Sequence, residues 1–222
     1  MKFLSPEEMN RLIDYAEAGY YRTLIMAAAF TGARHDDLLA LQWGDLDLNA
    51  ARVRICRSLS WARLSGEAVR PRFYQPKTKS GVRTIPLAPE LLHALKVWKL
   101  QCPASPEELV FPTPDGKPMY RGTVLRVGLY PALRRAGLRR VDMQSLRHSF
   151  ASGLVAQGCP VTEVQHYLGH SKATTTLSIY SHWFSRTQTD AVQQFAQRVR
   201  TGKWTPNRHL NEKTSREKAT ST

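Results

Sequence analysis

The chain has 222 residues, with 32 Lys and Arg against 18 Asp and Glu and a formal net charge of +14. Its ordinary hydrophobic content, 42%, indicates a folded core, so the excess charge predicts a polyanionic partner: nucleic acid first, an acidic membrane surface second. No apolar run approaches the roughly 20 residues of a membrane helix, and the N-terminus lacks the apolar stretch of a signal peptide. We therefore expect a cytoplasmic protein whose three scattered cysteines are reduced.

The first third of the chain is predicted to be helical. A capping box at residues 5–8, with proline at the first helical position, predicts a helix that runs to about residue 19. Residues 21–31 are rich in Leu, Ile, Met and Ala and indicate a buried second helix that Gly32 ends. This glycine presents Arg34 at a turn, and a short leucine-rich helix follows.

The middle of the chain changes to a β pattern. Residues 51–55, 69–74 and 82–87 are compatible with strands, and Lys79-Ser80-Gly81 between the last two has the composition of a turn. We expect these strands to form one small three-stranded antiparallel sheet with a basic hairpin tip.

The remainder returns to helical spacing. Apolar periodicity and Gly or Pro breaks predict helices at residues 89–101, 121–136, 145–157, 160–169 and 190–199. From residue 201 the sequence is polar and basic, typical of a tail that is disordered or ordered by a partner. The expected organisation is therefore one domain over residues 1–200, mainly α with a small sheet (α+β), and a tail over 201–222.

Several side chains in these elements suggest a phosphate site. The phenol of Tyr180 has an ordinary pKa of about 10, so it needs cationic neighbours or a base in order to attack at neutral pH. Arg34 and Arg147 each stand at or just inside a predicted helix start, and His170 follows the helix-ending Gly169.

Four blocks, in order, resemble the catalytic domain of tyrosine recombinases, the phage-integrase family. They are Thr-Gly-x-Arg-x-x-Asp-Leu at residues 31–38, Pro-Lys-Thr-Lys-Ser-Gly-x-Arg-x-Ile-Pro-Leu at 76–87, Leu-Arg-His-Ser-Phe-Ala-Ser at 146–152, and Leu-Gly-His-Ser followed by Tyr-Ser-His over 168–182. The first block alone is a weak signal, but four in the family's order are a specific one. The resemblance covers roughly residues 4–200.

The resemblance implies a site-specific recombinase or integrase that cleaves and rejoins DNA without metal, ATP or another cofactor. By resemblance, Tyr180 is the nucleophile that forms a 3′-phosphotyrosyl link, and Arg34 and Arg147 clamp the scissile phosphate. His170 donates a further hydrogen bond to the phosphate, and Asp37 orients the site.

The proton donor for the leaving 5′ oxygen is a lysine on the hairpin. Lys77 is preferred and Lys79 is the alternative; we expect the other lysine and Arg83 to contact the DNA backbone. Arg121 and Arg126 are further candidates for DNA binding, or else part of a solvated basic face.

One position departs from the family pattern. Three residues before Arg147 the family usually has His or Lys, and here it is Gln144, whose neutral amide can donate a hydrogen bond but carries no charge. This departure motivates an alternative reading as a catalytically impaired DNA-binding module. A second alternative is a type IB topoisomerase-like activity that relaxes DNA.

The expected partners are double-stranded DNA and further copies of the chain. The family resemblance implies a synaptic tetramer on DNA and a monomer when free. Family members usually carry a separate N-terminal DNA-binding domain, so we expect either an excised catalytic domain or a naturally short recombinase. No Asp/Glu cluster suggests a two-metal nuclease, and no phosphate-binding Gly-rich loop suggests ATP.

Overall fold

The computed structural model describes residues 3–62, 69–76, 78–172, 174–177, 193, 196–197 and 200–201. The chain divides into two compact units, residues 1–181 and 182–222. Of the second unit, residues 193, 196–197 and 200 are helical. The fold described below is that of the first unit, and the domain boundary at residue 200 stays a prediction.

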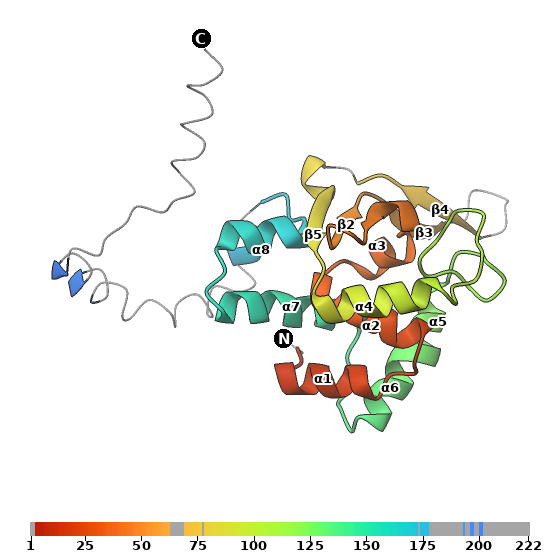
Figure 1. The fold of residues 1–222 in the computed structure, drawn as a ribbon, viewed down its shortest axis with the longest axis horizontal. Helices are drawn as coiled ribbons and strands as arrows, with labels where there is room; N and C mark the ends of the chain where they lie inside the picture. The colour runs from red at the N-terminus through yellow and green to blue at the C-terminus, as the bar shows by residue number, and fades with distance from the viewer. Residues whose placement is uncertain are drawn as a thin grey trace, which may run out of the picture. The chain divides into compact units, whose positions relative to one another are not determined.

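Helices make up most of the described chain (Figure 1). The α-helices are α1 (Pro6–Asp14), α2 (Tyr20–Thr31), α3 (His35–Leu39), α4 (Pro89–Lys99), α5 (Arg121–Thr123), α6 (Tyr130–Arg135), α7 (Met143–Ala156) and α8 (Val161–Leu168). Two 3₁₀ turns, η1 (Trp43–Asp45) and η2 (Lys79–Gly81), and a π-helical turn, η3 (Val124–Leu129), complete them. Within the described ranges, each helix is too short or not apolar enough to cross a bilayer.

The strands form two antiparallel sheets rather than one. The strands are β1 (Leu46–Asp47), β2 (Arg52–Ile55), β3 (Ser58–Ala62), β4 (Arg70–Tyr74) and β5 (Arg83–Pro86). β1, β2 and β5 pair in that order, with Val53 opposite Ile85, and β3 pairs only with β4. The predicted class, mainly α with small antiparallel β, is confirmed. The predicted sheet is wrong, because β4 pairs with β3 and β1 is the third strand beside β2 and β5; neither β1 nor β3 was predicted. The segment between β4 and β5 therefore connects two sheets and is not the predicted hairpin.

The capping box at the start of α1 is confirmed. Ser5 Oγ accepts a hydrogen bond from the Glu8 N–H at 3.2 Å, and the Glu8 carboxylate accepts from the Ser5 N–H at 2.8 Å. The helix ends at Asp14, earlier than predicted, and Arg22 in α2 donates hydrogen bonds to carbonyl oxygens at and just after its end. Nη2 of Arg22 donates to the oxygen of Asp14 at 3.0 Å, and Nε donates to that of Ala16 at 3.1 Å.

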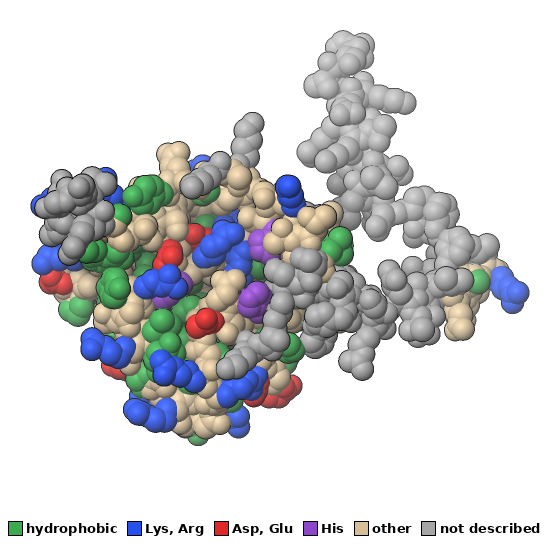
Figure 2. All heavy atoms as spheres, turned by 180° about the vertical axis from the view of Figure 1, so that it is seen from behind, with side chains coloured by type: hydrophobic (Ala, Val, Ile, Leu, Met, Phe, Trp, Pro, Cys, Tyr) green, Lys and Arg blue, Asp and Glu red, His purple; other side chains and the backbone are tan. Residues whose placement is uncertain are grey.

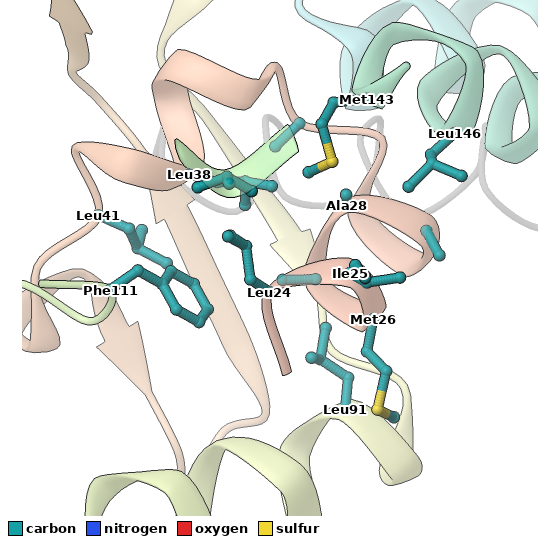
Figure 3. Close-up of a cluster of buried hydrophobic side chains, with 14 of the residues drawn as sticks. Leu24, Ile25, Met26, Ala28, Leu38, Leu41, Leu91, Phe111, Met143 and Leu146 are labelled. Carbon is teal, nitrogen blue, oxygen red and sulfur yellow. The ribbon is translucent and has the colours of Figure 1, made fainter. Parts of the chain in front are cut away.

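The core is organised around α2, which is in contact with α1, α3, α4 and α7 (Figure 1). Figure 3 shows Leu24 and Ile25 of α2 together with Leu38 of α3, Phe111 from the segment between α4 and α5, and Leu146 of α7. Because these side chains are at most 1% exposed, the segments that carry them are held firmly against one another. Two of them, α3 and α7, also carry candidate site residues.

Candidate active site

Arg34 lies at the turn between α2 and α3. Gly32 ends α2 in the left-handed conformation, with φ of +59°, and Arg34 is the extended residue that precedes α3. Oδ2 of Asp37 accepts a hydrogen bond from the Arg34 backbone N–H at 3.4 Å and lies 3.9 Å from Nη1. Asp37 is buried, whereas the Arg34 side chain is 46% exposed. The turn thus fixes the backbone of Arg34 and leaves its guanidinium accessible to an anion.

Arg147 lies one turn into α7, and its side chain is buried. The helix is capped by Asp142, whose Oδ1 accepts from the backbone N–H and the Oγ of Ser145, both at 2.8 Å. Nη1 of Arg147 donates to the carbonyl oxygen of Gly32 at 2.7 Å, and Nη2 donates to that of Leu168 at 2.5 Å. Arg147 therefore joins the end of α2 to the end of α8.

Arg83 is the second buried arginine, with 1% of its side chain exposed. Its Nε donates to the carbonyl oxygen of Tyr167 at 2.7 Å and its Nη1 to that of Gly81 at 3.0 Å. Nη2 pairs with Asp37 Oδ2 at 3.2 Å. Burial lowers the pKa of Arg83, and the adjacent Asp37 carboxylate opposes that shift. The contact of Arg83 with the DNA backbone stays a prediction, and in the structure its charge is compensated inside the protein by Asp37.

His170 follows a glycine turn at the end of α8. Gly169 ends the helix with φ of +64°. Nε2 of Gln165 donates to the carbonyl oxygen of His170 at 3.1 Å, and Nδ1 of His170 lies 2.9 Å from Oγ1 of Thr176. Both the backbone and the ring of His170 are thus held by neighbouring side chains.

The electrostatic surroundings keep His170 neutral. Burial lowers its pKa to about 4, and the positive charges of Arg147, Arg34 and Arg83 act in the same direction. A neutral imidazole that accepts from Thr176 at Nδ1 carries its proton on Nε2 and can donate one hydrogen bond there. Because three arginines act on one ring, their charges converge on the same part of the molecule.

A cavity of about 580 Å³ opens beside these residues. Its lining includes Arg34, Asp37 and His170, Tyr74 at the end of β4, and Pro76 and Thr78 of the β4–β5 connection. Arg83 and Arg147 are buried and do not line it. In Figure 2, arginine and lysine side chains gather near the middle of the face, next to histidine and carboxylate side chains. The cavity can take a group such as a phosphodiester.

A second cavity, about 220 Å³, is also lined by Arg34. Gln144 lines it together with His35 and Arg121. Arg121 is exposed, and its Nη1 lies 3.7 Å from Oδ2 of Asp36. Gln144 and Arg34 thus line the same cavity. Arg126 is exposed in η3, where DNA binding stays a prediction. Among the described residues, no group of three or more His, Cys, Asp or Glu side chains is arranged to hold a metal ion.

Two predicted site residues, Tyr180 and Lys77, lie outside the described residues. Lys79 begins the 3₁₀ turn η2, and its side chain is also outside the description. The described helical segment 174–177 ends three positions before Tyr180. The roles assigned to Tyr180, Lys77 and Lys79 therefore stay predictions.

The burial of Arg83 was not predicted, although the sequence contains one signal for it. In β5, Arg83 and Ile85 are buried while Thr84 and Pro86 face outward. Alternation with period two places Arg83 on the same face as Ile85, which predicts an inward side chain. The contacts of Gln165 and Thr176 with His170 had no comparable signal, because they depend on the turn between them.

Comparison with known proteins shows the family to which the chain belongs. The phage integrase family model matches residues 2–186, so the chain belongs to the phage integrase family, and the resemblance drawn from the four motif blocks is confirmed.

Relatives and solved structures agree with the family assignment. The chain is 26% identical over 205 residues to a tyrosine recombinase XerC-like protein of Caldanaerobacter subterraneus, with 85% of this chain and 52% of the relative covered. It is 30% identical over 202 residues to the prophage integrase IntR of Escherichia coli K12, with 81% and 47% covered. The chain thus spans about half the length of these curated relatives.

The structural likeness concerns the fold. The Tn1549 transposon integrase in complex with transposon right end DNA matches with a TM-score of 0.69 at 23% identity, over 86% of this chain and 66% of that one. The XerA recombinase matches with a TM-score of 0.66 at 22% identity, over 90% and 64%.

Proposed function

We propose that this chain is the catalytic part of a site-specific DNA recombinase or integrase that cleaves and rejoins DNA through a 3′-phosphotyrosyl intermediate. The observation that carries the proposal is the convergence of three arginine charges on His170, beside a cavity lined by Arg34 and His170. Such a site favours a phosphodiester whose negative charge grows in the transition state. The names of the matched relatives support recombination and favour neither alternative reading.

The chemistry is an in-line displacement at phosphorus. The phenolic oxygen of Tyr180 forms a bond to the scissile phosphorus while the bond from phosphorus to the 5′ oxygen breaks, and the phenolic proton passes to solvent. Arg34 and Nε2 of His170 donate hydrogen bonds to the nonbridging oxygens. Arg147 acts through its positive charge and by holding the two turns that carry Arg34 and His170.

The leaving 5′ oxygen takes a proton from the ammonium group of a lysine in the β4–β5 connection, Lys77 or Lys79. The covalent intermediate retains the energy of the phosphodiester, so a 5′ hydroxyl can reverse the reaction on a second strand without ATP. Gln144 lines a cavity together with Arg34. Its neutral amide donates a hydrogen bond to the phosphate at the position where the family usually has His or Lys.

The partner is double-stranded DNA, bound by the basic surface of the chain. This binding involves Arg121, Arg126 and whichever of Lys77 and Lys79 is not the proton donor. Recombination joins two sites, so the active assembly is a tetramer of this chain on DNA, and the free chain is a monomer. The expected place of action is the cytoplasm.

Suicide DNA duplexes built from the DNA that flanks the gene test this proposal. We expect a denaturant-resistant adduct between protein and DNA, and joint molecules only when two sites are supplied. Relaxation of supercoiled DNA without paired sites would favour the topoisomerase-like reading. Binding without an adduct on a cognate site would favour the impaired DNA-binding module.

A further inference from the structure

Arg83 connects three segments that are far apart in the sequence. Its guanidinium contacts the η2 turn through the carbonyl of Gly81, the end of α8 through the carbonyl of Tyr167, and α3 through the carboxylate of Asp37. All three contacts are 3.2 Å or shorter, and the side chain is 1% exposed. A planar fork with several donors suits this junction, whereas the single ammonium of a lysine does not.

Each connected segment leads to a group in the proposed chemistry. Asp37 also contacts Arg34. Tyr167 lies three residues before His170, at the end of the helix that presents it. Gly81 closes the turn that contains Lys79 and that begins directly after Thr78, the neighbour of Lys77. One buried side chain thus contacts the phosphate-binding side and the proton-donating side of the site.

The junction is tightly packed around Arg83. A Cβ added at Gly169 would lie 3.0 Å from Nη1 of Arg83 and 3.1 Å from the carbonyl oxygen of Ser80. A Cβ added at Gly81 would lie 2.3 Å from Cβ of Pro76. The η2 turn therefore lies between the Gly169 turn and Pro76, with little room to shift.

Hydrogen bonds within the turn restrict it further. The N–H of Gly81 donates to the carbonyl oxygen of Thr78 at 2.9 Å, and the hydroxyls of Thr78 and Ser80 lie 3.0 Å apart. The segment from Thr78 to Gly81 is thereby closed into a turn. That turn is anchored to the rest of the site through Arg83.

We propose that Arg83 is a positioning residue for the proton-donating lysine of the β4–β5 connection, which it holds in place relative to the turns that carry Arg34 and His170. This inference rests on the proposed function. In the step concerned, the lysine ammonium gives its proton to the 5′ oxygen as the bond from phosphorus to that oxygen breaks. Arg83 touches neither the DNA nor the lysine side chain in this role and acts through the backbone of the turn.

The test compares two leaving groups. One suicide duplex has the natural 5′ oxygen at the scissile phosphate, and the other has a bridging 5′ sulfur, which leaves as a thiolate without needing a proton. Arg83→Lys keeps the positive charge and removes the fork. We expect it to slow adduct formation roughly 100-fold on the oxygen substrate, the contribution of a general acid. On the sulfur substrate we expect a rate within about threefold of the unmodified protein, because a thiol has the lower pKa.

Further variants serve as controls for the comparison of the two substrates. Lys77→Ala or Lys79→Ala, whichever removes the proton donor, is expected to show the same selective defect as Arg83→Lys. Arg34→Ala is expected to slow both substrates alike, because it acts on the phosphate. Arg139→Lys replaces a half-exposed arginine that pairs with Glu8 at 2.5 Å, outside the site, and is expected to change neither rate.

The ratio of the two rates is taken on one protein preparation, so it does not depend on the fraction that is folded, and Arg83→Gln provides a second variant. Equal slowing of both substrates by Arg83→Lys, or slowing of neither, would overturn the positioning role while leaving the recombinase proposal intact. Absence of any adduct with the unmodified protein on the sulfur substrate would overturn the proposed function and this inference with it.

Discussion

The buried guanidinium of Arg147 donates a 2.7 Å hydrogen bond to the carbonyl oxygen of Gly32, two residues before Arg34. Its other terminal nitrogen donates to the carbonyl oxygen of Leu168, two residues before His170. One side chain therefore holds both chain reversals that carry candidate phosphate ligands. The geometry of the site depends on this link as well as on the ligands themselves.

The Gly32 turn is predicted to be intolerant of any side chain. In Gly32→Ala the backbone keeps a φ of +59°, and the new Cβ meets Cδ1 of Phe150 at 2.3 Å. Left-handed strain of about 1 kcal/mol adds to overpacking of roughly 1–3 kcal/mol. We expect the free energy of unfolding, measured by urea denaturation, to fall by about 2–4 kcal/mol.

Gly137→Ala is the matched control for this substitution. Gly137 has nearly the same φ, +62°, but nothing lies within 4 Å of an added Cβ. We expect only the backbone term, about 1 kcal/mol. Equal destabilisation by the two substitutions would contradict the tight contact between Gly32 and Phe150.

Arg34 and Arg147 are predicted to differ in their effect on stability. Arg34→Ala removes a half-exposed side chain, so the free energy of unfolding should change by less than about 1 kcal/mol. Adduct formation should nevertheless slow by about 10²–10³-fold, as for loss of one oxyanion donor. Arg147→Ala should slow the reaction and also destabilise the fold by about 3 kcal/mol, because two buried carbonyl oxygens lose their partner. Denaturation curves paired with adduct rates measure both, and a stability loss for Arg34→Ala as large as for Arg147→Ala would contradict the assignment.

His35 is predicted to make stability depend on pH. Both of its ring nitrogens are buried without a hydrogen-bond partner among the described residues, and Arg121 lies near it. Burial, followed by the charge of Arg121, lowers the pKa of His35 from its usual 6.5 to about 4. Since the unfolded chain binds the proton more tightly, this contribution is complete above about pH 6.5 and is lost as the pH falls toward 4. The full loss is on the order of 3 kcal/mol.

Urea denaturation at pH 7 and at pH 4.5 measures this dependence. In His35→Gln the loss of stability between the two pH values should shrink, and the remainder should include His170, whose pKa is lowered in the same direction. His93→Gln, which replaces an exposed histidine of α4, should keep the full loss. A slope that is unchanged in His35→Gln would show that His35 titrates normally in the folded protein.

Much of the helical framework was predictable because its signals are local. Ser5 and Glu8 mark a helix start through hydrogen bonds within one turn, and Gly32 and Gly169 mark helix ends through left-handed backbone. The same local signals placed Arg34 and His170 at turns. Their convergence followed from the family resemblance and not from the local pattern.

What the sequence did not reveal depends on long-range pairing. The segment Arg70–Tyr74 is compatible with a strand in either sheet, and only its pairing with Ser58–Ala62 decides which. Arg83 looked exposed because a lone arginine favours water, yet Asp37, 46 positions earlier, compensates its charge in the interior. The alternation with Ile85 indicates an inward side chain, but no local pattern identifies Asp37 as its partner.

The most direct test of the account is to map the covalent adduct formed with a suicide duplex. Tyr180→Phe is compared with Tyr74→Phe, which alters a tyrosine that lines the cavity beside Arg34. We predict that the adduct maps to the peptide containing Tyr180, is lost in Tyr180→Phe and persists in Tyr74→Phe. An adduct that survives in Tyr180→Phe, or that maps to Tyr74, would contradict the assignment of the nucleophile and the mechanism built on it.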